Sequence, residues 1–316
     1  MTPALADANN GNRQTANRWA RMLGGDYRVE LGTRWTASPD DPAAVLLALH
    51  ARRSADSVAR WAQQQPVRPL VVVLTGTDLY RDIHFDAGAQ HSISVAQRLV
   101  VLHERAVDDL PPQYRAKAVV CLQSTPARAP WPKTRRHLRA LMVGHLRQEK
   151  SPQTYFDTAR LLALRRDIRL DHIGAALDPA LGRAAQETQR DCPSYRWLGA
   201  LPHPATRRRI QRAHVLVHPS RMEGGAHVVM EAVRSGTPVL ASRIAGNIGM
   251  LGAGYRGYFE PGDAQGLAAL LQRCRDEPRI LEDLAAQCAA RSPLFDPARE
   301  RATLLALLAD LLETAE

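Results

Sequence analysis

The sequence is poor in aromatic residues, in cysteines and in long apolar runs. Phe, Trp and Tyr make up 5% of its 316 residues, which argues against the stacking platforms that bind single-stranded nucleic acids. The four cysteines form no C-x-x-C pair, so neither a zinc site nor a disulfide framework is indicated, and a reducing compartment fits best. No stretch approaches the roughly 18 uncharged apolar residues of a membrane span. We therefore expect a cytoplasmic protein without stable membrane insertion.

Positive charge is abundant. The formal net charge is +10 and the sequence pI is about 10.0. The arginines are spread over most segments, with short clusters only at Arg135–Arg136 and Arg207–Arg209, whereas a nucleic-acid-binding arm concentrates them. We therefore expect no nucleic-acid partner, and the excess charge indicates either a solvated surface or a site for phosphorylated ligands.

Short apolar, β-branched runs alternate with segments of helical spacing, which is typical of βα units around a parallel sheet. Such runs lie at residues 45–49, 70–74, 99–102 and 118–122, and again at 138–143, 168–173, 195–198, 214–217 and 238–241. The proline-rich segment 124–132 suits a linker between the two groups. The pattern predicts an α/β fold with two Rossmann-like domains, 1–132 and 133–296, and a closing amphipathic helix at 297–316.

The N-terminus lacks the strand expected of a βα unit. Met1 leads directly into a polar turn at Asp7–Asn12, followed by a helix around Thr15–Leu23. Either a first strand precedes this sequence or the sheet begins elsewhere, and we favour the first explanation.

The strongest chemical pattern lies at residues 218–242, which combine a strand end, a glycine-bearing loop, a helix and another strand. Gly224 and Gly225 let backbone N–H groups approach an anion where the helix begins. Glu223 and Glu231 can each accept two hydrogen bonds from a vicinal diol, one on a sugar and one on a ribose. Such a pair also occurs on solvated helices, so the flanking His-Pro-Ser and Gly-Thr-Pro-Val-Leu-Ala-Ser carry much of the inference.

This spacing of two glutamates resembles the retaining glycosyltransferases of the GT-B fold. The resemblance implies that Glu223 contacts the donor sugar, that the amides of Gly224, Gly225 and Ala226 hold a diphosphate, and that Glu231 binds the ribose. It also implies two parallel sheets facing across a cleft, with an N-terminal acceptor domain, a C-terminal donor domain and a last helix that crosses back to the first domain.

The segment 143–151, Val-Gly-His-Leu-Arg-Gln-Glu-Lys-Ser, is similar to the family's G-R-L-x-x-E-K. The resemblance implies that Lys150 holds the departing diphosphate. His145 stands at the family's arginine position, and Arg147 could supply the missing charge. A fixed cation is needed because sugar–phosphate cleavage builds negative charge on the leaving group. Alternatively, Arg147 and Lys150 are solvated charges at a strand end.

Neither a metal nor a cofactor is expected. The sequence has no Asp-x-Asp pair to hold a divalent ion. The resemblance therefore implies a metal-independent enzyme, in which Arg147 and Lys150 take the place of the ion.

Two segments of the first half complete the expected site. Gly11 and Asn12 occupy the place of the family's glycine-rich loop, which faces the donor phosphates, although a plain turn that caps a helix fits these residues equally well. The loop 74–82 follows a buried strand at its carboxyl end, the edge where open α/β sheets bind ligands. Thr77 and Asp78 are therefore expected at the acceptor.

The segments 11–15, 74–82 and 143–147 resemble a subgroup, the selenosugar synthases of selenoneine biosynthesis. The resemblance implies that selenophosphate attacks a UDP-sugar, such as UDP-N-acetylglucosamine or UDP-glucose, with Arg13 and Arg81 suited to binding the anion. Two alternatives stay open: a GT-B enzyme with a hydroxyl acceptor, and a noncatalytic nucleotide-sugar or nucleic-acid binding protein.

Residues 252–257 fit the dinucleotide-binding pattern G-x-G-x-x-G. No clear strand precedes them, and Tyr258–Gly262 follows where that motif requires a helix. We therefore expect a loop before a last short strand.

Overall fold

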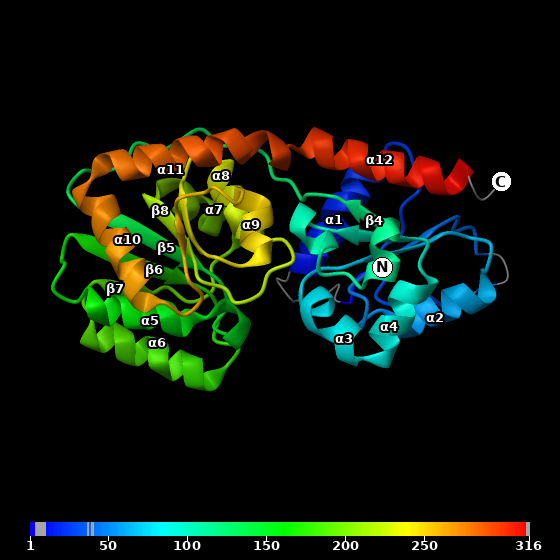
Figure 1. Ribbon diagram of the computed structural model, residues 1–316, viewed down its shortest axis with the longest axis horizontal. Helices are drawn as coiled ribbons and strands as arrows, with labels where there is room; N and C mark the ends of the chain where they lie inside the picture. The colour runs from blue at the N-terminus through cyan, green and yellow to red at the C-terminus, as the bar shows by residue number, and fades with distance from the viewer. Residues whose placement is uncertain (4–10, 37, 39–40, 314–316) are drawn as a thin grey trace. The chain divides into compact units, whose positions relative to one another are not determined.

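The computed structural model describes residues 1–3, 11–36, 38 and 41–313 (Figure 1). The chain divides into two compact units. The first comprises Met1–Ser124, Glu223–Gly225 and Pro297–Glu316, and the second comprises Thr125–Met222 and Ala226–Asp296. Of the polar turn expected at Asp7–Asn12, residues 7–10 lie outside the described part.

The first unit contains a four-stranded parallel sheet whose strands follow chain order. They are β1 (Leu46–Leu49), β2 (Leu70–Val73), β3 (Arg98–Val101) and β4 (Ala118–Val120). Each lies within an expected apolar run or differs from it by one or two residues. Side chains of a strand alternate between its faces, so Leu70 and Val72 join one apolar cluster while Val71 and Val73 join another.

Helices cover both faces of this sheet. One cluster includes Val58 and Trp61 of α2 (Ala55–Gln64) and Ala89 and Ile93 of α4 (Ala87–Val95). The other includes Trp19 of α1 (Gly11–Leu23) and Leu304, Leu307, Leu308 and Leu311 of α12 (Pro297–Glu313). The closing helix is therefore present, and within the first unit it packs beside α1.

Met1 lies along the edge of β1. Its amino group donates to the Leu47 carbonyl oxygen at 2.7 Å, and the Leu49 amide donates to the Met1 carbonyl oxygen at 3.1 Å. Met1 therefore pairs with the edge of β1 through two main-chain hydrogen bonds.

The second unit contains a six-stranded parallel sheet in the order β10-β9-β8-β5-β6-β7. Its strands are β5 (Leu138–Val143), β6 (Ile168–Ile173), β7 (Tyr195–Trp197), β8 (Val215–His218), β9 (Val239–Ser242) and β10 (Tyr258–Phe259). Its helices are α5 (Pro152–Leu161), α6 (Pro179–Asp191), α7 (His203–Arg212), α8 (His227–Val233), α9 (Ala245–Leu251), α10 (Ala264–Asp276) and α11 (Pro278–Arg291). The expected loop at 252–257 does precede a last short strand, β10.

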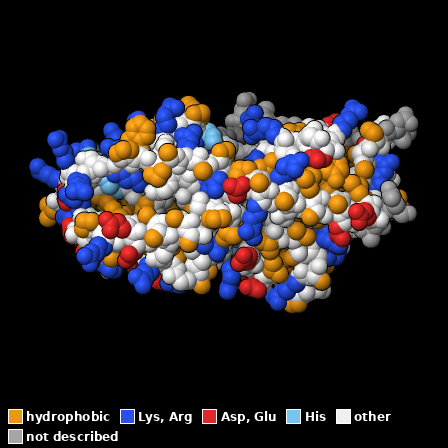
Figure 2. All heavy atoms as spheres, turned by 90° about the horizontal axis from the view of Figure 1, so that it is seen from above, with side chains coloured by type: hydrophobic (Ala, Val, Ile, Leu, Met, Phe, Trp, Pro, Cys, Tyr) orange, Lys and Arg blue, Asp and Glu red, His pale blue; other side chains and the backbone are white. Residues whose placement is uncertain are grey.

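Several features that the composition suggested can be checked in the structure. All four cysteines are buried free thiols. Within the described part of the chain, no helix combines the length and the apolar character that crossing a bilayer requires. On the face shown in Figure 2, Lys and Arg side chains are scattered among apolar and acidic ones.

Candidate active site

The strand order of the second unit has a topological switch point between β5 and β8. The chain enters the sheet at β5, continues outward through β6 and β7, and returns to the other side of β5 as β8. In open α/β sheets, ligands bind outside the carboxyl ends of the strands at such a point. The loops that leave β5 and β8 there are the two segments with the strongest chemical pattern.

A main-chain hydrogen bond joins these two loops. The Arg221 amide, in the loop after β8, donates to the Glu149 carbonyl oxygen, in the loop after β5, at 2.9 Å. The residue that follows Glu149 is Lys150, which ends a one-turn helix at Gln148–Lys150. The fold thus fixes the backbone next to Lys150 to the loop that leads to Glu223.

The first turn after β5 lies close against the loop after β6, through a hydrogen bond to His145 and a tight contact at Gly174. The Nδ1 atom of His145 accepts a hydrogen bond from the Ala175 amide at 3.0 Å. A Cβ atom on Gly174 would lie 1.9 Å from the Gly144 carbonyl oxygen, so only glycine fits there. His145 therefore fastens this loop to the loop after β6, while Arg147 is exposed and Lys150 half-buried.

The loop after β8 presents two adjacent backbone amides. Among the described residues, neither the Gly224 nor the Gly225 amide has a hydrogen-bond acceptor, whereas the Ala226 amide donates to Sδ of Met250 at 3.3 Å. Backbone N–H groups that are removed from water require a partner. Two such groups side by side fit the oxygens of an anion. Both precede α8, which begins at His227.

Close packing makes glycine necessary at position 224. Residues 223–225 group with the first unit, and a Cβ atom on Gly224 would lie 2.5 Å from the carbonyl carbon of Thr75. Glu223 is 9% exposed.

Glu231 lies on α8 and is bound by two residues that sequence analysis missed. Its Oε1 atom accepts a hydrogen bond from His203 Nε2 at 2.6 Å and lies 3.6 Å from a guanidinium nitrogen of Arg207. Burial lowers the pKa of Arg207, and the charge of Glu231 opposes that shift. Within the described part of the chain, no residue hydrogen-bonds the second oxygen, Oε2.

Sequence analysis also missed a cluster of buried polar residues beneath the loop after β8, formed by Ser220, Ser242 and Asn247. Ser242 Oγ donates to the Ser220 carbonyl oxygen at 2.5 Å, and Asn247 Nδ2 donates to the Ser242 carbonyl oxygen at 2.9 Å. The Ser220 hydroxyl and the Asn247 Oδ1 atom have no hydrogen-bond partner among the described residues. Buried polar atoms are usually satisfied, so these two are further candidates for a ligand.

In the first unit, Asp78 organises the loop after β2. Its carboxylate is fully buried and accepts hydrogen bonds from the amides of Ala51, Thr75 and Gly76 at 3.0, 2.9 and 2.8 Å. These bonds tie the loop after β1 to the loop after β2. The geometry favours a role for Asp78 in shaping the expected acceptor loop over direct contact with a ligand.

Thr77 and Arg81 extend from the same loop. The Thr77 hydroxyl lies 3.2 Å from His50 Nε2, and Arg81 is exposed with its Nε atom 3.0 Å from an oxygen of Asp82. His50 adopts a left-handed backbone conformation with φ of 74°, and burial lowers its pKa. Sequence analysis missed His50 because a single histidine after a strand has no distinctive spacing.

A second buried histidine follows β3. His103 Nε2 and the Tyr80 hydroxyl are 2.7 Å apart. Burial, reinforced by the charge of Arg105, lowers the pKa of His103 to about 4. His103 is therefore neutral near pH 7.

Gly11, Asn12 and Arg13 do not form the loop that sequence analysis expected. They are the first residues of α1, which begins four residues earlier than the predicted helix around Thr15. Inside this helix the Thr15 hydroxyl donates to the Gly11 carbonyl oxygen at 2.9 Å and accepts from Gln123 Nε2.

No metal centre is evident in the described part. Among those residues, no three His, Cys, Asp or Glu side chains could hold an ion together. His214 and His218 have the i, i+4 spacing of some metal ligands. His214 lies just before β8 and His218 ends it, so the two are about 13 Å apart at strand rise and cannot share an ion.

Comparison with known proteins agrees with this architecture. The family model described as glycosyl transferases group 1 matches residues 107–291, more than half of the chain. A search among curated proteins gives no match.

Solved structures of similar fold cover most of the chain at low sequence identity. They include a TarM variant from S. aureus with fondaparinux, α-GlcNAc-glycerol and UDP (TM-score 0.69, 12% identity, 85% of this chain and 55% of that one). They also include Alr3699/HepE from Anabaena with UDP and glucose (TM-score 0.68, 17% identity, 84% of this chain and 77% of that one). A third is sucrose-phosphate synthase from Thermosynechococcus elongatus (TM-score 0.72, 18% identity, 87% of this chain and 75% of that one). The chain thus spans about half the length of TarM. The two parallel sheets and these similarities confirm the predicted α/β fold of the GT-B type.

Proposed function

Because the chain belongs to the glycosyl transferases group 1 family, we propose that it transfers a sugar from a UDP-sugar to a small anionic acceptor, selenophosphate. The observation that carries the assignment of a UDP-sugar donor is the topological switch point of the second sheet. There the loops after β5 and β8, which hold Lys150 and Glu223, are joined by the hydrogen bond from the Arg221 amide to the Glu149 carbonyl oxygen.

Three features support a nucleotide diphosphate at this point. The amides of Gly224 and Gly225 are suited to phosphate oxygens, Lys150 and Arg147 supply positive charge, and Glu231 offers Oε2 to a ribose. Uridine is the nucleoside we propose because similar folds, TarM and HepE, were solved with UDP.

The proposed reaction breaks one bond and forms one. Selenium donates an electron pair to the anomeric carbon, the bond from that carbon to the β-phosphate oxygen breaks, and its electron pair leaves with UDP. Lys150 and Arg147 stabilise the charge that builds on the leaving group, and Glu223 orients the sugar through its hydroxyls. This scheme requires no metal ion.

The acceptor assignment rests on the resemblance of three segments to selenosugar synthases. In this proposal Thr77 and Arg81 bind selenophosphate, Arg13 adds charge near the start of α1, and Asp78 holds the loop in shape. Because Arg81 is paired with Asp82, the anion must compete with that carboxylate for the guanidinium.

The test is turnover of the full chain with UDP-N-acetylglucosamine or UDP-glucose and selenophosphate, with UDP release and a selenium-bearing sugar as readouts. We expect Lys150→Ala and Glu223→Ala each to lower kcat about 100-fold or more, the scale of losing one stabilising group. Arg183→Ala, on the exposed face of α6, is the matched control and should stay within about twofold of wild type. Activity should survive a chelator.

Each part of the proposal can fail separately. Native turnover by both site variants would refute the site, and loss of activity with a chelator would refute metal independence. UDP release with an alcohol but not with selenophosphate would refute the acceptor and leave the donor half standing.

A further inference from the structure

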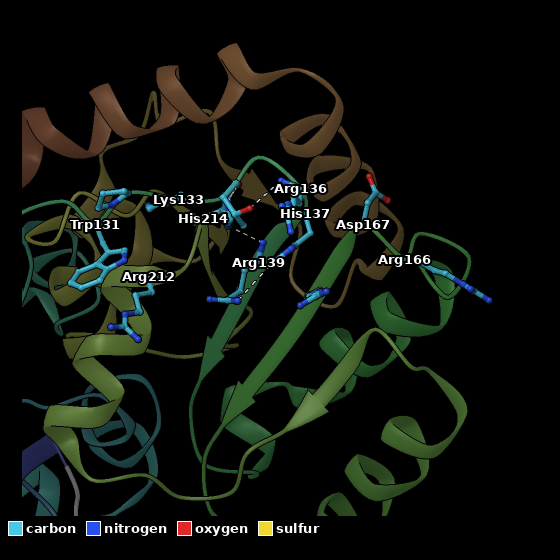
Figure 3. Close-up of a pocket in the computed structure, with 12 residues that line it drawn as sticks. Trp131, Lys133, Arg136, His137, Arg139, Arg166, Asp167, Arg212 and His214 are labelled. Atoms are coloured by element: carbon cyan, nitrogen blue, oxygen red, sulfur yellow. Dashed lines mark hydrogen bonds between the residues drawn. The ribbon is translucent and has the colours of Figure 1, made fainter.

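The second unit has a large hollow at the amino edge of its sheet, the edge opposite the candidate donor site. Its volume is about 790 Å³, within the usual range for small-molecule sites. Its walls come from the segment before β5, from the starts of β5, β6 and β8, and from the end of α7 (Figure 3). A strand of this length is about 20 Å long, so the hollow and Lys150 lie near opposite ends of β5.

The hollow is strongly basic. Its lining includes five arginines and one lysine, but only one carboxylate, that of Asp167. That carboxylate is already bound by two arginines outside the lining, Arg165 at 3.0 and 3.1 Å and Arg275 at 2.8 Å. Among the residues described, none of the five lining arginines forms an ion pair with a carboxylate, so their charge is uncompensated.

Two of these arginines lie opposite each other. Arg139 of β5 and Arg169 of β6 are partners in the parallel register. Like charges on neighbouring positions repel each other. An anion between the two guanidinium groups would replace this repulsion by attraction. Guanidinium groups are well suited to phosphate oxygens because they donate in pairs.

Hydrogen bonds of His214 join two segments that line the hollow. His214 Nδ1 accepts from the Arg139 amide at 3.0 Å, and its Nε2 donates to the Thr134 carbonyl oxygen at 2.7 Å. Burial lowers the pKa of His214, and the charges of Lys133 and Arg139 lower it further. Burial also lowers the pKa of Lys133 to about 8, so its ammonium group is still mostly charged near pH 7.

The scarcity of aromatic side chains in the lining argues against binding by base stacking. Trp131 is the one large aromatic side chain in the lining, and the Arg212 guanidinium lies over its ring at 4.4 Å. Arg212 therefore lies over one face of the ring, and a single tryptophan that is 45% exposed offers less stacking surface than the several aromatic side chains of a single-strand binding platform.

We propose that this hollow binds a compact phosphate-rich anion of the inorganic polyphosphate or nucleoside triphosphate class, at a site separate from the donor site. Arg139 and Arg169 clamp the anion from adjacent strands, and Arg136, Arg166 and Arg212 complete the ring of charge. The inference does not depend on the sugar donor or on the acceptor.

The experiment is isothermal titration of the full chain, saturated with UDP, with inorganic tripolyphosphate. We expect binding at one site and at least a tenfold weaker affinity in Arg139→Gln/Arg169→Gln. Arg183→Gln/Arg279→Gln removes the same charge from exposed positions of α6 and α11 and should stay within about twofold. Tripolyphosphate should raise the thermal midpoint of wild type more than that of the Arg139/Arg169 variant, which without the anion should be no less stable.

The remaining outcomes overturn the proposal. They are no binding, equal weakening in both double variants, or unchanged affinity in Arg139→Gln/Arg169→Gln. An RNA oligomer that binds the wild type more than tenfold tighter than tripolyphosphate, and loses that affinity in the same variant, would assign the hollow to a nucleic acid.

Discussion

At the scale of single residues, Glu231 shows how local pattern and distant contact combine. Its spacing from Glu223 marks it as a candidate ligand in the sequence. The structure adds that Oε1 is held by His203, which lies 28 residues earlier in the chain. One oxygen is thus fixed in position, and the other is the oxygen that we propose binds a ribose.

We predict that Glu231→Gln weakens the binding of UDP about tenfold or more and changes kcat less. The amide keeps the size of the side chain but loses the charge that strengthens a hydrogen bond, which contributes about 1.5–3 kcal/mol. Titration with UDP measures the effect. An unchanged Kd would show that Glu231 only supports His203 and Arg207.

At the scale of elements, a buried carboxylate of α12 adds hydrogen bonds to the apolar packing that holds this helix within the first unit. Glu300 is 1% exposed and accepts from Arg18 at 2.8 and 2.9 Å, from Trp19 Nε1 at 2.6 Å and from the Ser124 amide at 2.9 Å. The side chain therefore joins α12, α1 and the segment after β4.

Glu300→Ala should lower the free energy of unfolding by about 3–5 kcal/mol, because Arg18 would keep a largely buried charge without its partner. Glu313→Ala removes an exposed glutamate from the same helix and serves as control, with an expected change below about 0.5 kcal/mol. Urea unfolding measures both. Similar losses in the two variants would contradict the anchoring role.

The elements were predictable to different degrees. The four strands of the first sheet and β5 to β9 of the second coincide with apolar runs to within about two residues, because strands buried on both faces read as continuous apolar segments. The start of α1 was misplaced, since Gly11 and Asn12 are residue types that favour turns over helices, yet the structure places them in the helix.

At the scale of the whole molecule, buried histidines make stability depend on pH. His103 and His172 are both 0% exposed, and burial lowers the pKa of each to about 4 from the ordinary value of 6.5. His172 is further held between the Tyr195 hydroxyl and the Gly144 carbonyl oxygen. Both side chains are neutral in the folded protein near pH 7.

Stability should therefore fall as the pH drops from about 6.5 to about 4. In that window the unfolded chain binds protons on these histidines and the folded chain does not, so acid favours unfolding, by on the order of 3 kcal/mol for each group. Urea unfolding between pH 7.5 and 4.5 measures how steeply the free energy of unfolding changes with pH. The variant His172→Gln should make this dependence less steep. Stability that rises on acidification across this range would refute the prediction.

The sequence by itself determined which segments are strands and which loops carry Gly224, Gly225, Glu223 and Lys150, because burial and backbone freedom are encoded in neighbouring residues. Only the tertiary structure decided that β8 returns beside β5, that His203 and Arg207 meet Glu231, and that Arg139 and Arg169 stand side by side at the opposite edge of the sheet. Those facts depend on strand order and register, which are set by packing between residues far apart in the chain and leave no periodic pattern in it.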